Sequence, residues 1–164
     1  MDRPKIEIIL SESDRLVETL ARVSLIILWG LTIYYYRLLP DTIPIHFNAA
    51  GNPDDYGTKL TIFLLPLIGT ILFIGLTILN KYPHKFNYPV EITPDNLLKQ
   101  YTVATKLIRF LKLIIIIIFI LINILSCMTA LGKTSGLGWW FLPLSLIMVF
   151  GTVIFYFFSA FKSK

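Results

Sequence analysis

The sequence predicts an all-α, polytopic membrane protein: a bundle of four transmembrane helices with both chain ends on the cytoplasmic side (N-in/C-in). Of the 164 residues, 55% are hydrophobic and only 15% are charged, whereas soluble domains carry about a quarter charged residues. Apolar segments of membrane-spanning length recur along the chain, and basic residues gather in alternate connections between them. We therefore expect residues 1–164 to form a single integral membrane domain.

The spans follow from where charge is missing. A helix needs about 20 apolar residues to cross a hydrocarbon core of about 30 Å. No charged residue lies between Lys59 and Lys81, or between Lys112 and Lys133. The chain then stays uncharged from 134 to 161. Together with a first span described next, the expected membrane segments are about 23–39, 61–80, 110–131 and 138–161.

The first helix should begin before it enters the membrane. Ser11 and Asp14 have the spacing of a capping box, which predicts a helix start there. Arg22 and Arg37 bound the apolar part, and their long side chains can reach the membrane interface. We expect a helix over about 12–39 with its membrane part at 23–39.

The distribution of Lys and Arg predicts the orientation. The N-terminal tail, the 81–112 connection and the C-terminal tail hold four, six and two, while the other two loops hold two and one. This bias places both termini and loop 81–109 in the cytoplasm, and loop 40–59 outside. Aromatic residues favour membrane interfaces, and five fall at the expected outer one: Tyr34, Tyr35, Tyr36, Trp139 and Trp140.

The cytoplasmic connection ends in a strong helix-start signal, Thr93–Pro94–Asp95. The third helix is expected over about 94–131, and at about 1.5 Å per residue it would be roughly 57 Å long. Its first turns, 94–109, should project into the cytoplasm and present Leu97, Leu98, Tyr101 and Leu107 to a partner. That partner is either the N-terminal segment of the same chain or a separate cytoplasmic protein.

Several chemical functions are disfavoured. Between the basic residues that border them, such as Arg37 and Lys112, the expected spans contain no Asp, Glu, Lys, Arg or His, which argues against a proton- or sodium-driven carrier. A nucleophilic triad, a phosphate-binding loop and a HExxH motif are absent from the sequence. Cys127 is the single cysteine, so an intramolecular disulfide or a Cys-based zinc site is impossible. We assign no catalytic residue, cofactor or metal ligand, and no nucleic-acid partner.

The stretch PIHFNAAGNPDDYGTK, residues 44–59, holds the densest polar chemistry outside the cytoplasm. We expect it to recognise a ligand or partner through His46, Asn48, Gly51, Asp54 and Lys59, with Tyr35, Tyr36, Trp139 and Trp140 as an aromatic rim. Two other interpretations stay open. Gly51–Asn52–Pro53–Asp54 is also typical of a scaffold turn. His46, Asn48, Asp54 and Asp55 have side chains that can bind a divalent cation, although their spacing matches no metal motif.

This stretch also carries a family resemblance. The pattern P-x-H-F-N-x-x-G-x-P-D at 44–54, followed by Lys59 and an apolar span, resembles the domain of unknown function at the N-terminus of SdpI-type bacterial membrane proteins. The connection NYPVEITPDNLLKQYTVATKLIRFLKL is similar to that family's cytoplasmic loop. The resemblance implies a multi-pass protein of the bacterial inner membrane. SdpI-type proteins protect a producer cell from the membrane-active SdpC toxin, and some hold a repressor at the membrane.

The sequence therefore favours a non-enzymatic membrane protein of the immunity or signalling type, whose outer loop engages a peptide toxin or another membrane protein. One alternative is an accessory subunit of a transporter that docks through helix 94–109. The other is a membrane-embedded, metal-dependent enzyme or lipid-binding protein that uses His46 and the aspartates.

Overall fold

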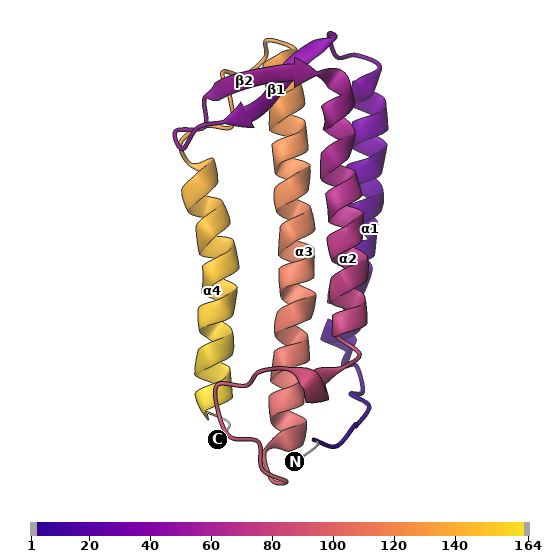
Figure 1. Cartoon of the computed structure of the whole chain (residues 1–164), viewed down its shortest axis with the longest axis vertical. Coiled ribbons are helices and arrows are strands. Elements are labelled where there is room, and N and C mark those ends of the chain that lie inside the picture. The colour runs from indigo at the N-terminus through magenta and orange to yellow at the C-terminus, as the bar shows by residue number, and fades with distance from the viewer. Residues whose placement is uncertain (1–2, 163–164) are drawn as a thin grey trace.

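Four long helices run side by side, and a small β-hairpin lies across one end of them (Figure 1). The computed structural model describes residues 3–162. The elements, in chain order, are α1 (Glu12–Tyr36), β1 (Thr42–Phe47), β2 (Pro53–Thr58), the 3₁₀ helix η1 (Lys59–Phe63), α2 (Leu64–Leu79), the 3₁₀ helix η2 (Pro83–Lys85), α3 (Leu97–Ala130) and α4 (Phe141–Lys162). We call the end with the strands the hairpin end. The opposite end, where both chain ends lie, is the terminal end.

The helices confirm the predicted fold class. Four helical segments among the described residues are long and apolar enough to cross a membrane: α1, η1 with α2, α3 and α4. Most large apolar side chains on α2 and α4 are exposed, as expected where lipid rather than protein covers a helix. The chain is thus an all-α, multi-pass helix bundle of the membrane type.

Helix α1 starts where the capping box predicts. The Asp14 amide donates to Ser11 Oγ (3.3 Å), and the Ser11 amide donates to Asp14 Oδ2 (3.0 Å). The helix ends at Tyr36, earlier than the expected 39. The amides of Leu38 and Leu39 still turn back to the Tyr35 carbonyl before the chain enters β1.

Helix α3 is the centre of the bundle, because α1, α2 and α4 all pack against it, and α4 packs mainly on α3. It begins at Leu97 rather than at the predicted Pro94. Just before it, the Asn96 side chain accepts from the Thr93 amide (2.9 Å) and donates to the Glu91 carbonyl (3.0 Å). With 34 residues, α3 is about 51 Å long at roughly 1.5 Å per residue.

The first turns of α3 are covered by the chain itself. Tyr101 is fully buried, stacks on Tyr88 at 5.6 Å between ring centroids, and donates to the Pro4 carbonyl (3.3 Å). Burial raises the pKa of Tyr88 well above its ordinary value, so this phenol stays neutral and donates to the Pro83 carbonyl (2.9 Å). The N-terminal segment and the 81–96 connection therefore contact the face on which a partner was expected, while Leu98 remains exposed.

Mild polar contacts join the helices at membrane depth. Asn123 on α3 is fully buried and donates through Nδ2 to Thr32 Oγ1 on α1 (3.0 Å). Trp29 on α1 donates through Nε1 to Thr70 Oγ1 on α2 (3.0 Å). Such hydrogen bonds stabilise helix pairs in an apolar solvent by modest amounts.

Candidate functional site

The polar stretch at 44–59 folds as an antiparallel hairpin of β1 and β2. The sequence predicted a turn here but not its strands. Asn48 organises the tip: its amide donates to the Asn52 carbonyl (2.9 Å), and its Oδ1 accepts from the amides of Ala50 (3.0 Å) and Asn52 (3.1 Å). An Asn side chain that bonds the backbone ahead of it is a common way to fix a turn.

The hairpin tip is docked onto the loop between α3 and α4. The Leu137 amide donates to the Gly51 carbonyl at 2.7 Å. Gly51 has a φ of +79°, and a Cβ added there would lie 2.6 Å from the Gly138 carbonyl oxygen. Gly136 has a φ of +154°, and its added Cβ would clash with the Gly51 carbonyl oxygen. Only glycine allows two backbones to approach this closely with such φ values, so Gly51 fixes the hairpin in place.

Apolar packing holds the other end of the hairpin against the helices. Ile43 of β1 is buried with Leu39, Ile62 and Cys127, and Tyr35 and Tyr36 pack against this cluster. Lys59 closes the base of the hairpin. Its Nζ lies 3.0 Å from Asp41 Oδ1, donates to the Leu39 carbonyl (3.4 Å) and sits over the Tyr36 ring at 5.5 Å.

His46 and Asp54 face each other across the hairpin, and both remain accessible. His46 Nδ1 lies 2.5 Å from Asp54 Oδ1, while 67% and 41% of the two side chains are exposed. Irregular pairing on both sides of His46 lets this contact form, since His46 is opposite Asp55 in the strand register. The pair leaves His46 Nε2 and the second Asp54 oxygen available to an incoming polar group.

The expected aromatic rim is divided by the structure into two parts. Tyr35 and Tyr36 are half-buried beneath the hairpin, as described above. Trp139 and Trp140 are exposed and follow Gly138, the residue against which the hairpin tip packs. Of the nine residues expected at this site, His46, Asn48, Asp54 and the two tryptophans are exposed, and Asn48 already uses its side-chain oxygen within the hairpin tip.

An apolar cavity lies beneath β1, between α2 and α3. Its volume is about 350 Å³, and its walls include Pro44, Ile45, Phe47, Ile62, Leu65 and Ile122. Asn123 and Ser126 bring polar atoms to the same cavity from α3. An amphipathic ligand could place apolar groups here while its polar groups meet the hairpin.

A cluster of buried ion pairs lies nearer the terminal end, and the sequence analysis missed it. Lys112 on α3 donates to both carboxylate oxygens of Glu18 on α1 (2.9 and 2.8 Å) and to Thr77 Oγ1 on α2 (3.0 Å). Arg109 lies 3.4 Å from Asp14 Oδ1 and 3.8 Å from Glu18 Oε1. We call these four charged residues the ion-pair cluster.

The ion-pair cluster did leave a signal in the sequence. Asp14 and Glu18 are four residues apart, and Arg109 and Lys112 are three apart, so each pair lies on one helix face. Charges of opposite sign on two neighbouring helices can then meet. The count of Lys and Arg assigns these two residues only to the cytoplasmic connection, and it does not reveal that they join α1 to α3.

The described residues, 3–162, contain no group of three or more His, Cys, Asp or Glu side chains placed to hold a metal ion. Around the hairpin, His46 has Asp54 as its acidic neighbour.

Comparison with known proteins places the hairpin inside a recognised segment. Residues 23–70 match the profile of a domain of unknown function (DUF1648). This segment takes in most of α1, the whole hairpin and the first turns of α2.

A relative comes from the archaeon Archaeoglobus fulgidus, where it is described as an uncharacterized protein. It is 30% identical over 88 residues, which are 49% of this chain and 48% of the relative. The aligned region thus spans about half the length of each protein. No solved structure matches the chain. The comparisons thus support a helical protein of the membrane type with a DUF1648 segment, and the relative they identify is archaeal.

Proposed function

We propose that this protein is a non-enzymatic, multi-pass protein of the cell membrane that recognises a ligand with its hairpin. The observation that carries the proposal is the His46–Asp54 pair, which is exposed on a hairpin that is itself fixed at both ends. A rigid support lowers the conformational cost of binding. The exposed imidazole and carboxylate then supply a donor and acceptors for a polar ligand group.

The supporting residues refine the list drawn from the sequence. The side-chain oxygen of Asn48 accepts the hydrogen bonds that shape the hairpin tip. Gly51 has no side chain, and this lets the tip dock against the loop between α3 and α4. Lys59 is engaged at the hairpin base. We therefore propose His46 and Asp54 as the ligand-contacting residues, with Trp139 and Trp140 next to the docked tip. Asn48, Gly51 and Lys59 are positioning residues.

A membrane-active peptide toxin fits this surface best. Ile45 and Phe47, which flank His46 in β1, line the apolar cavity, so one ligand can contact both the pair and the cavity from the membrane interface. The resemblance of residues 44–54 to SdpI-type proteins points to the same class, namely immunity or toxin-dependent signalling. The bias of Lys and Arg supports an orientation with the hairpin outside and both termini in the cytoplasm.

The orientation has a direct test. A reporter that is active only outside the cell membrane should stay inactive when fused after Lys85, and should be active when fused after Lys133. The reverse pattern would place the hairpin in the cytoplasm and remove the proposed encounter with an external toxin.

The function is tested by survival. A strain sensitive to an SdpC-type toxin is given the wild-type chain, an empty vector or His46→Ala, with membrane levels matched by immunoblot. We expect wild type to protect and His46→Ala to protect at least tenfold less, because the imidazole would contact the ligand. Equal killing of wild-type and empty-vector cells would count against immunity to that toxin.

A further inference from the structure

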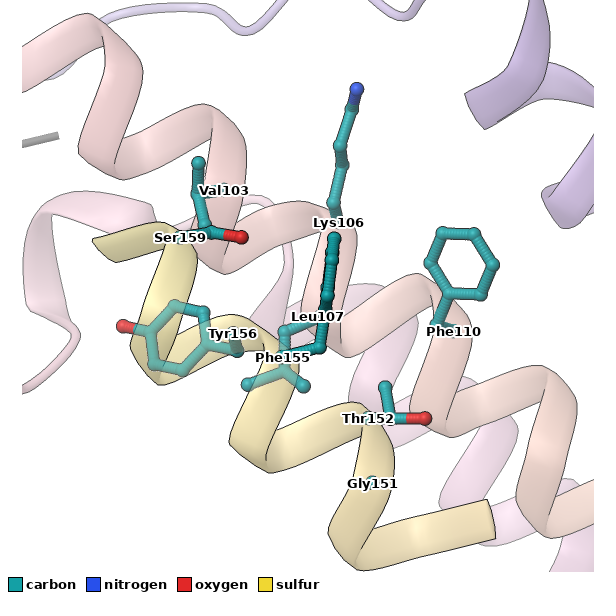
Figure 2. Close-up of a pocket in the computed structure, with 9 residues that line it drawn as sticks. All are labelled: Val103, Lys106, Leu107, Phe110, Gly151, Thr152, Phe155, Tyr156 and Ser159. Atoms are coloured by element: carbon teal, nitrogen blue, oxygen red, sulfur yellow. The ribbon is translucent and has the colours of Figure 1, made fainter. Parts of the chain in front are cut away.

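A second accessible feature lies far from the hairpin, between α3 and α4. A groove of about 500 Å³ runs between these helices near the terminal end (Figure 2). We call it the α3–α4 groove; its defining residues are Lys106, Leu107, Phe110, Gly151, Thr152 and Phe155. It shares no residue with the hairpin or with the ion-pair cluster.

On the α4 side, the groove is lined by a glycine, Gly151. A Cβ added at Gly151 would have no heavy atom within 4 Å, so the space beside it is empty. About one and a half and two and a half turns further along α4, Tyr156 and Ala160 pack with Ala104 of α3 and close the groove at that end. The result is an elongated apolar slot rather than a general separation of the helices.

The groove lies on the surface that a membrane would cover. Phe155 is 73% exposed and Phe110 is 44% exposed, and both belong to helices long and apolar enough to span a bilayer. Apolar side chains in such a position meet acyl chains rather than water. The hydroxyl of Thr152 is already bonded to the Met148 carbonyl (2.8 Å), which leaves the wall effectively apolar.

One cation borders this apolar slot. The stem of Lys106 lines the groove, and Figure 2 shows the side chain extending away from α4, so its ammonium lies beyond the apolar wall. No carboxylate within residues 3–162 pairs with it. Arg109 and Lys112, the next basic residues on α3, are by contrast engaged with Asp14 and Glu18. No Asp or Glu lines the groove.

We propose that the α3–α4 groove binds an anionic phospholipid, with one acyl chain in the slot and the phosphate paired with Lys106. Charge complementarity favours an anionic headgroup. Every phospholipid carries a phosphate that can meet Lys106, but the choline or ethanolamine of a zwitterionic lipid adds a cation for which the groove offers no carboxylate. A lysine whose stem lies along apolar surface while its ammonium reaches the headgroup level is the usual arrangement at an interface.

Native mass spectrometry of the full-length chain tests the proposal. The protein is released from detergent with either phosphatidylglycerol or phosphatidylcholine carrying identical acyl chains, and bound lipid is counted. Wild type should retain phosphatidylglycerol in preference. Lys106→Gln should weaken its retention about fivefold, the loss expected for one lysine near an anionic headgroup, while Lys106→Arg should keep it.

A second variant tests the slot itself. An added Cβ at Gly151 meets nothing within 4 Å, so Gly151→Leu places a side chain in this open space and should reduce retention of phosphatidylglycerol by at least as much as Lys106→Gln. Two matched controls should bind as wild type does: Lys99→Gln, a charge loss two turns away on α3, and Gly75→Leu on α2, where an added Cβ also meets nothing within 4 Å.

The proposal is overturned if wild type retains both lipids equally, or if Lys106→Gln and Gly151→Leu retain phosphatidylglycerol as well as their controls do. Circular dichroism of each variant confirms that the helices are intact. None of these readouts depends on toxin, so the result is separate from that of the survival assay.

Discussion

The two ends of the bundle use the same kind of contact in opposite surroundings. At the hairpin end, His46 and Asp54 form a pair whose side chains are 67% and 41% exposed. Toward the terminal end, Lys112 and Glu18 form a pair whose side chains are 1% and 12% exposed. Water competes for the first pair and is largely excluded from the second. The exposed pair therefore adds little to stability and is available to a ligand, whereas the buried pair is committed to holding α1 against α3.

The largest effect should come from breaking the buried pair. Lys112→Met removes the ammonium that contacts both Glu18 oxygens and leaves Glu18 with Arg109 at 3.8 Å, and breaking a buried ion pair by removing one partner costs about 3–5 kcal/mol. When the protein is unfolded in mixed micelles with an increasing fraction of denaturing detergent, the midpoint of the Lys112→Met transition should lie at a lower detergent fraction than that of wild type. Lys99→Met, an exposed position on the same helix, should leave the midpoint unchanged.

A double variant sharpens this prediction. Replacing both partners, Glu18→Leu with Lys112→Met, removes the charge together with its partner and should recover most of the lost stability. If the double variant is as unstable as the sum of the two single ones, the pair is not what holds these helices.

Gly51→Ala should have the next largest effect, and it should be confined to the hairpin end. The positive φ and the approach of Gly138 leave no space for a Cβ, and a strained residue of this kind costs about 1–3 kcal/mol. Faster hydrogen exchange at the Leu137 amide, which bonds to Gly51, would report the undocked tip. Gly30→Ala is the control, because its Cβ would meet nothing within 4 Å.

A smaller loss of stability is expected when a hydrogen bond between two membrane-spanning helices is removed. Asn123→Leu breaks the hydrogen bond to Thr32, and such interhelical bonds contribute about 0.6 kcal/mol on average, with a maximum near 1.7. A double-mutant cycle with Thr32→Val measures the coupling. A coupling of several kcal/mol would mean that this contact, rather than the ion-pair cluster, dominates the α1–α3 interface.

The smallest effect on stability should come from the exposed pair. His46→Ala and Asp54→Asn each weaken a surface contact, and such contacts contribute about 0–1 kcal/mol. The unfolding midpoints should stay near wild type while protection against toxin falls. A large loss of stability would show that the pair is structural and would weaken the case for recognition.

The sequence predicted the parts of the fold that depend on local pattern. Long apolar segments gave the helices, and the spacing of Ser11 and Asp14 placed the start of α1 at the correct residue. The hairpin strands were missed because β1 and β2 are six residues each and are stabilised by pairing and docking rather than by their own pattern. The role of Gly51 depends on Gly136 and Gly138, which are more than 80 residues away in the chain.

The candidate site was predictable in composition but not in detail. The sequence predicted His46, Asn48 and Asp54 as site residues. The structure shows that His46 and Asp54 contact each other, and that Asn48 forms its hydrogen bonds within the hairpin tip. The ion-pair cluster could not be seen by counting charges along the chain, because its members come from α1 and α3 and meet only in the folded bundle. Pairing across helices is tertiary information.

The central claim is that the exposed hairpin pair recognises a ligand, and two neighbouring aspartates provide its most direct test. Asp54 contacts His46, whereas Asp55 accepts a hydrogen bond from the Tyr56 amide and is equally on the exposed hairpin. Cells challenged with an SdpC-type toxin should be protected by wild type and by Asp55→Asn at matched membrane levels, but not by Asp54→Asn. Equal protection by the two variants, or equal failure of both, would contradict recognition through the His46–Asp54 pair.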